Sequence, residues 1–290
     1  MTVTVVCIQC GYPLEGAYAS ECPRCASSVT PLTPTDPQQR SGVGKAFLVW
    51  VVNVVALFVL QLVGAVLYLV AGAYWTGERP PFELNTPLAI VTLGATLIAH
   101  GITLALCWFV VTGTGTRPFW QTLGWKWHHQ FKSIHAVALA LLMLVFGLVL
   151  ERVLPHGKTD FERLLELGFS VRIFIVVLAV GTAPFVEEIV YRGLIYSAIE
   201  KARGWKTAVT VVTLLFATVH VPQYWGSPAA IVAILSLSLV LTLLRAFTGQ
   251  LLPCVATHFV FNSVQAVVLL ASPPGVRESA TTALISWMPF

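Results

Sequence analysis

Long apolar runs are the feature of this sequence that most restricts its fold. A helix needs about 20 predominantly apolar residues to cross the hydrocarbon core of a bilayer. Runs of this kind, of which the fifth is short, lie at about 46–73, 88–112, 133–150, 171–199, 206–221, 229–247 and 250–271. Hydrophobic residues make up 57% of the chain and charged residues only 10%, whereas soluble domains carry about 25% charged residues. The sequence therefore predicts an all-α polytopic membrane protein with about seven transmembrane helices.

Changes in composition divide the chain into five regions. Residues 1–30 form a cysteine-containing module, and residues 31–45 are rich in Pro, Ser, Thr and Gly without apolar periodicity, which is typical of a linker. Residues 46–165 contain the first transmembrane helices, and residues 166–275 form a second membrane region that carries most of the polar side chains. Residues 276–290 are a C-terminal tail.

Four cysteines form two Cys-x-x-Cys pairs in the stretch CIQCGYPLEGAYASECPRC. They are Cys7, Cys10, Cys22 and Cys25. Two such pairs can together supply the four thiolates of a tetrahedral zinc site. Two disulfides or a redox-active pair are the alternatives, but a reducing cytoplasm argues against disulfides and no βαβ pattern supports a thioredoxin-like pair. We predict a small zinc ribbon in which a structural zinc ion stabilises a fragment too small to have its own core.

The distribution of Lys and Arg between the loops predicts an orientation. The N-terminal arm carries Arg24, Arg40 and Lys45. The loop after the first apolar run carries only Arg79, and the loop at 222–228 carries neither Lys nor Arg. The connection between the third and fourth runs breaks this alternation between loops, because it carries both Lys and Arg residues. Since cytoplasmic loops are enriched in Lys and Arg, we expect a multi-pass protein of the cell membrane with a cytoplasmic N-terminus. The net charge of +4, spread over several loops, favours a lipid bilayer rather than a nucleic acid as partner.

Polar side chains interrupt three of the later apolar runs. A charge inside a bilayer costs from ~2.5 to more than ~10 kcal/mol, so charged residues in membrane helices usually serve a function. The polar residues are Glu187, Glu188 and Arg192 in the fourth run, His220 in the fifth, and His258 and Asn262 in the seventh. They come from three separate runs, so they can meet only inside a bundle of helices.

Helical spacing predicts how these side chains are arranged. Glu188 and Arg192 are four residues apart and can pair on one face of a helix. Glu187 projects about 100° away from Glu188, so it is free to point elsewhere. His258 and Asn262 share a face of the seventh run. Two imidazoles, an amide and a carboxylate could therefore converge inside the membrane.

Such a set of groups supports hydrolysis. A carboxylate can take a proton from water, while an imidazole can bind a metal ion or donate to a developing oxyanion. One alternative is a purely structural Glu–Arg brace between helices. Another is a proton-coupled transporter, since transporters also bury carboxylates and histidines. A transporter would be expected to show an internal repeat with broken helices in both halves, and no convincing repeat is present.

The stretches EEIVYR, FATVH and HFVFN resemble the three motifs of the CPBP intramembrane proteases, the group of CAAX proteases and bacteriocin-processing proteins. The family pattern is Glu-Glu-x-x-x-Arg, then Phe-x-x-x-His, then His-x-x-x-Asn or Asp, and all three occur here in this order. The resemblance covers about residues 170–272. It implies a multi-helix membrane peptidase whose site lies within the bilayer, with the region 166–275 as its catalytic core.

Carried over by position, the resemblance assigns roles to the polar residues of the fourth and fifth runs. Glu187 would activate the attacking water. Glu188 would lie beside it, held by Arg192. His220 would help to hold the water or a metal ion. The implied reaction is the hydrolysis of a peptide bond in a membrane protein or lipidated peptide substrate.

The seventh run and the metal complete this implied site. His258 and Asn262 would stabilise the tetrahedral oxyanion. The family is commonly called metalloprotease, yet a glutamate-activated water without metal has also been argued, so a catalytic metal such as zinc is left open. The usual zinc-protease spacing His-Glu-x-x-His is absent. Some family members act in bacteriocin immunity or regulation, which leaves a non-catalytic membrane protein of the same family as the alternative.

Overall fold

A computed structural model describes residues 5–6, 13–14, 37–78, 80, 83–155 and 157–271. The chain divides into two compact units, Met1–Ser41 and Gly42–Phe290. In the first unit, strand β1 (Val5–Val6) pairs in antiparallel fashion with strand β2 (Pro13–Leu14).

The predicted zinc ribbon falls largely on a part of the chain that the structure does not describe. Its four ligands, Cys7, Cys10, Cys22 and Cys25, lie outside the described residues. The structural zinc therefore stays a prediction. The same holds for the predicted tail at 276–290, which also lies outside the described part of the chain.

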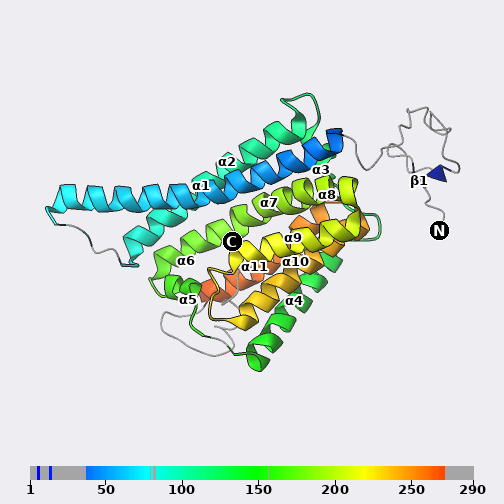
Figure 1. Ribbon diagram of the computed structural model, residues 1–290. Coiled ribbons are helices and arrows are strands. Elements are labelled where there is room, and N and C mark those ends of the chain that lie inside the picture. Colours follow the sequence, from blue (N-terminus) through cyan, green and yellow to red (C-terminus); the bar gives the residue numbers. More distant parts are fainter. Residues whose placement is uncertain are drawn as a thin grey trace. The chain divides into compact units, whose positions relative to one another are not determined.

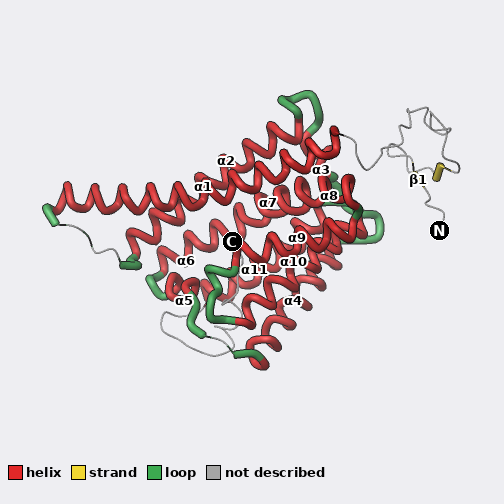
Figure 2. The backbone as a smooth tube through the Cα atoms, in the orientation of Figure 1, coloured by secondary structure: helices red, strands yellow, loops and turns green. Residues whose placement is uncertain are grey.

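Helices make up the described part of the second unit and are joined by short loops (Figures 1 and 2). Its α-helices are α1 (Pro37–Thr76, which begins in the first unit), α2 (Thr86–Thr112), α3 (Phe119–Leu123), α4 (Ser133–Val153), α5 (Asp160–Leu165), α6 (Phe169–Val176), α7 (Ala183–Glu188), α8 (Tyr196–Arg203), α9 (Trp205–His220), α10 (Pro228–Thr248) and α11 (Leu252–Ala271). Two π-helical segments, η1 (Val177–Thr182) and η2 (Ile189–Ile195), join α6, α7 and α8 into one continuous helix. We call this continuous helix, Phe169–Arg203, the fourth span.

Six helices in the described part of the chain are long and apolar enough to cross a membrane. They are Gly42–Thr76, Thr86–Thr112, Ser133–Val153, Phe169–Arg203, Pro228–Thr248 and Leu252–Ala271. The run predicted at 206–221 is helix α9, which has 16 residues. At 1.5 Å per residue it is about 24 Å long, shorter than the ~30 Å hydrocarbon core. The prediction of about seven transmembrane helices is therefore approximately consistent with the six candidate spans and one shorter apolar helix.

Local sequence signals explain where the helices begin and end. Helix α2 starts at Asn85 and α10 at Ser227, whose side chains each accept a hydrogen bond from a backbone N–H of the first turn. A proline follows each cap, where its missing N–H costs nothing. Both helices end at a glycine in the left-handed conformation, Gly113 with φ 58° and Gly249 with φ 64°.

The C-terminal helices pack around the fourth span. Helix α10 lies against α9 and α4, and α11 lies against α4, α7 and η1. Helix α1 differs, because its surface is largely exposed and apolar, as a lipid-facing helix requires. Polar side chains join it to the rest of the bundle. Gln61 donates to Thr96 at 3.1 Å, and Asn53 accepts from Thr103 at 2.6 Å.

Candidate active site

The fourth span places both glutamates between two π-helical segments. Helix α7 ends with Glu187 and Glu188, η1 precedes it and η2 follows it. A π segment carries an extra residue per turn and is frequently found at functional sites. Pro184 in the first turn of α7 cannot donate a hydrogen bond to an earlier carbonyl. This proline therefore favours a break in the α-helical hydrogen-bonding pattern just before the glutamates.

Arg192 is fully buried and joins the fourth span to helix α10. Its Nη1 donates to Glu188 Oε1 at 2.9 Å, as the four-residue spacing predicts. Its Nη2 donates to Ser238 Oγ at 2.9 Å and to the Ser238 carbonyl at 3.0 Å. Its Nε donates to Thr242 Oγ1 at 3.2 Å. The guanidinium carbon also lies 4.7 Å from the centre of the Phe216 ring. Charge and hydrogen bonds together offset the cost of burying this cation.

His258 binds the same carboxylate from helix α11. Its Nδ1 lies 2.9 Å from Glu188 Oε1, and because a carboxylate oxygen accepts, Nδ1 carries the hydrogen. The other ring nitrogen, Nε2, lies 3.9 Å from Glu187 Oε2. Glu188 thus fixes the orientation of His258 and directs its second nitrogen towards Glu187.

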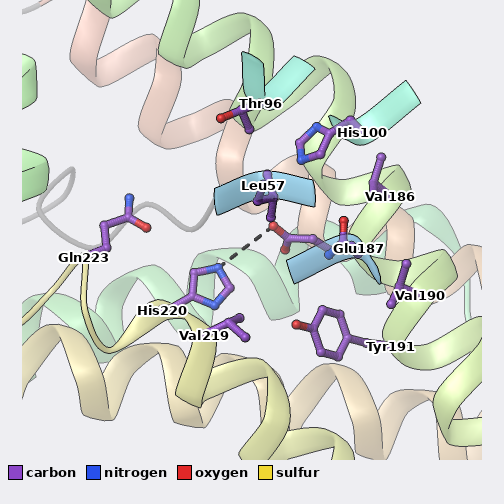
Figure 3. A pocket seen from close by; sticks show the side chains of 11 residues that line it. Leu57, Thr96, His100, Val186, Glu187, Val190, Tyr191, Val219, His220 and Gln223 are labelled. Atoms are coloured by element: carbon purple, nitrogen blue, oxygen red, sulfur yellow. Dashed lines mark ion pairs between the residues drawn. The ribbon is translucent and has the colours of Figure 1, made fainter. Parts of the chain in front are cut away.

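His220 is oriented by the backbone of its own helix. Its Nδ1 lies 2.7 Å from the carbonyl oxygen of Phe216 and therefore donates to it. The ring also stacks on Phe216 with centroids 4.6 Å apart. Nε2 is left with its lone pair and lies 4.0 Å from Glu187 Oε1, the contact marked by the dashed line in Figure 3. Histidines from two helices therefore face the two oxygens of Glu187.

A cavity of about 110 Å³ opens at Glu187 and His220 (Figure 3). A water molecule needs only about 10–15 Å³ of such volume, so the cavity has room for several. Its lining comes from α1, α2, the fourth span, α9 and the loop that follows α9. The lining residues are Asn53, Leu57, Thr96, His100, Val186, Glu187, Val190, Tyr191, Val219, His220 and Gln223. His258 and Asn262 are not among them.

Asn262 occupies a different place from the one expected. In η1 the N–H of Ala183 donates to the carbonyl of Leu178, five residues earlier. The next carbonyl, of Ala179, would be met in this register by Pro184, which has no N–H. Asn262 Nδ2 donates to this carbonyl instead, at 2.7 Å. The structure therefore directs the Asn262 amide nitrogen to the fourth span rather than to the cavity.

Several polar residues of the site were missed in the sequence. Ser238 and Thr242 are four residues apart in a predominantly apolar helix, a spacing that could have marked them. His100 lies in a long apolar run, and its Nδ1 is 2.8 Å from Thr182 Oγ1. Tyr191 is one of the unspecified positions of the Glu-Glu-x-x-x-Arg pattern, yet it lines the cavity.

The spacing of these side chains differs from that of a metal site. Among the described residues, no group of three or more His, Cys, Asp or Glu side chains has a geometry that could hold a metal ion. Ligand atoms about 2.0–2.2 Å from a tetrahedral zinc lie ~3.4 Å apart, whereas the nitrogens of His220 and His258 lie 4.0 and 3.9 Å from the Glu187 oxygens. These residues do not fit a metal as they stand. A metal in the membrane stays a prediction, and no step below uses one.

The fold and the site together define a class, that of multi-helix membrane proteins with a buried carboxylate–histidine site. Comparison with models of protein families matches residues 169–264 to the family described as Rce1-like, Type II CAAX prenyl endopeptidase Rce1-like. The matched segment contains all of the polar residues from Glu187 to Asn262. The match supports the CPBP family for the C-terminal membrane helices and, with the apolar helices, a membrane protein. No curated protein and no solved structure matches the chain.

Proposed function

We propose that this protein is an intramembrane endopeptidase in which Glu187 activates the attacking water. The observation that carries the proposal is the environment of this carboxylate. Glu187 is 9% exposed, lines the cavity and faces one histidine nitrogen with each oxygen. Among the described residues its Oε2 has no hydrogen-bond donor, and its Oε1 lies 4.0 Å from His220 Nε2, a gap that leaves room for a water. The family match supports peptide hydrolysis as the reaction.

The separation of Glu187 and His220 suits a bridging water. The gap of 4.0 Å between Oε1 and Nε2 is too long for a direct hydrogen bond. A water about 2.8 Å from both atoms would subtend roughly 90° between them, which is within the range a water molecule tolerates. Both atoms accept hydrogen bonds, and a water has two hydrogens to donate. Such a water would be held with its oxygen lone pairs turned away from both groups.

The proposed reaction is a general-base hydrolysis. Glu187 takes a proton from the water while the water oxygen attacks the carbonyl carbon of the peptide bond. The carbonyl electron pair moves to oxygen and forms a tetrahedral oxyanion. When the carbon–nitrogen bond breaks, that pair restores the carbonyl and the leaving nitrogen takes the proton back from Glu187. His220 accepts the second hydrogen bond of the water and so orients the attack.

In this proposal Glu188, Arg192 and His258 form a fixed environment for the base. Arg192 fixes Glu188 through α10, and Glu188 fixes His258, whose Nε2 lies 3.9 Å from Glu187. These contacts fix the side chains around the base before substrate arrives, which lowers the reorganisation needed during reaction. The proposal extends to a substrate that is a membrane-associated or lipidated protein, a location in the cell membrane and a cytoplasmic N-terminus.

The variant Glu187→Gln tests the proposal, because glutamine keeps the shape of glutamate but cannot take the proton. Cleavage of an internally quenched peptide with a farnesylated cysteine followed by three residues would be followed in detergent micelles. We expect Glu187→Gln to lose at least about 100-fold in kcat and to accumulate normally in the membrane. The matched control Glu78→Gln changes an exposed glutamate and should leave kcat unchanged. A Glu187→Gln protein that cleaves at the wild-type rate would end the assignment of the base.

A further inference from the structure

The cavity contains Glu187 and His220 but needs a hydrogen-bond donor for the oxyanion. Asn262 is not among the residues that line the cavity, and one N–H of its amide group donates to the Ala179 carbonyl. His220 does not supply it either, since its donating nitrogen is bound to the backbone of α9. Tyr191 lines the same cavity four residues after the proposed base, and its hydroxyl can both accept and donate a hydrogen bond.

Trp50 on helix α1 determines what the Tyr191 hydroxyl can do. The indole Nε1 lies 3.1 Å from the Tyr191 oxygen. An indole N–H only donates, so the tyrosine oxygen is the acceptor and its own hydrogen is left to donate elsewhere. Within the described part of the chain, no group accepts that hydrogen. The hydroxyl therefore has one donor position that protein atoms do not use.

The placement of Tyr191 directs this donor into the cavity. Tyr191 follows Glu187 by four residues, so both side chains lie on the same side of the fourth span. In Figure 3 the hydroxyl end of Tyr191 points towards the space beside His220, below the Glu187 carboxylate. The ring is 3% exposed and packs edge-on against Phe216 with centroids 5.1 Å apart. A ring held in this way presents its hydroxyl in a fixed direction.

We propose that Tyr191 is a further catalytic residue, whose hydroxyl donates a hydrogen bond to the oxyanion of the tetrahedral intermediate. The inference rests on the proposed peptidase function. No proton moves from Tyr191: the carbonyl electron pair passes to oxygen during attack, is held there by the O–H group, and returns when the carbon–nitrogen bond breaks. The hydrogen bond from Trp50 withdraws electron density from the phenol oxygen and so strengthens its O–H as a donor.

The variant Tyr191→Phe removes the hydroxyl and keeps the ring that packs on Phe216. One oxyanion donor is typically worth about 100-fold to 1,000-fold in kcat, so we expect a loss of that size with little change in KM. The farnesylated quenched peptide is the probe, and rates are normalised to folded protein measured by size-exclusion chromatography. Tyr74→Phe, at a tyrosine that is 80% exposed, is the matched control and should behave as wild type.

A second measurement separates transition-state binding from a structural role. A phosphonate analogue of the same peptide carries the charged, tetrahedral geometry of the intermediate. Tyr191→Phe should raise the Kd of the phosphonate by about the factor lost in kcat. The Kd of the uncleaved peptide is measured in an inactive Glu187→Gln background, with and without Tyr191→Phe, and should be the same in both. Loss of turnover with unchanged phosphonate affinity would overturn the proposal. So would Tyr191→Phe turning over at the wild-type rate.

Trp50→Phe tests the part played by helix α1. Its loss of kcat should be smaller than that of Tyr191→Phe, and it should cost nothing further when Tyr191 is already Phe. Equal costs of Trp50→Phe in both backgrounds would contradict the action of Trp50 through Tyr191.

The peptidase mechanism and the role of Tyr191 can be rejected independently of each other. An inactive Glu187→Gln beside a fully active Tyr191→Phe rejects the tyrosine alone, whereas a fully active Glu187→Gln rejects the peptidase mechanism itself.

Discussion

Replacement of Arg192 by Met gives a quantitative test of how the site is held together. Methionine is unbranched and fills much of the volume of the arginine side chain without its charge. Arg192 and Glu188 are both 0% exposed, so neither can turn to solvent when its partner is lost. The variant removes the cation that neutralises Glu188. It also removes the N–H groups that donate hydrogen bonds to Ser238 and Thr242.

The expected cost follows from these contacts. Removal of one partner from a buried ion pair costs about 3–5 kcal/mol, because the remaining charge stays buried without compensation. His258 still donates to Glu188, which places the expected loss of unfolding free energy for Arg192→Met near the lower end, about 3 kcal/mol. The double variant Glu188→Gln with Arg192→Met removes the stranded charge and keeps an acceptor for His258. It should be more stable than Arg192→Met by about 2 kcal/mol.

Chemical denaturation in detergent micelles measures both differences. Arg203→Met, at an exposed arginine at the end of the same span, is the matched control and should change the free energy of unfolding by less than ~0.5 kcal/mol. A loss below ~1 kcal/mol for Arg192→Met would refute the reasoning, since it would mean that Glu188 is hydrated or already neutral. A double variant less stable than the single variant would refute it as well.

Two further predictions concern the π segment and the cysteine module. Asn262→Leu should lower the free energy of unfolding by about 1–3 kcal/mol, because the carbonyl of Ala179 loses its donor; the cost should shrink in a Pro184→Ala background, where residue 184 regains an N–H, and an equal cost in both would contradict the account. Deletion of residues 1–30 should remove about one zinc ion per chain, as measured by elemental analysis, and leave the membrane unit folded; unchanged zinc content would place the metal elsewhere.

Apolar length carried most of the fold prediction. Each predicted run corresponds to a helix or to a continuous series of helices, and the caps at Asn85 and Ser227 follow ordinary rules. The predicted count of about seven spans is approximately consistent with the six candidate spans and the short helix α9, because apolar composition alone does not distinguish a short helix from a spanning one. Helix α9 is 16 residues long and amphipathic in character, with its buried face ending at His220.

The motif residues of the candidate site were predictable, but its other members and several of its contacts were not. Spacing by four residues correctly paired Glu188 with Arg192, because both lie on one helix. The position of Asn262 could not be foreseen, since it depends on a π register that leaves one carbonyl of another helix without a donor. Tyr191 was overlooked because its hydroxyl gains a direction only from Trp50, which lies 141 residues earlier in the chain.

Pro184 also has a mechanical consequence for the fourth span. The extra residue of a π segment can in principle migrate along a helix, as each N–H exchanges the carbonyl five residues back for the one four residues back. Pro184 has no hydrogen to exchange, and Asn262 occupies the carbonyl at which the exchange would stop. The extra residue of η1 is therefore trapped on the N-terminal side of Glu187. Sliding or twisting of the first half of the span therefore cannot pass this point as a screw motion. The Glu187 carboxylate keeps its orientation while the rest of the helix adjusts to the bilayer.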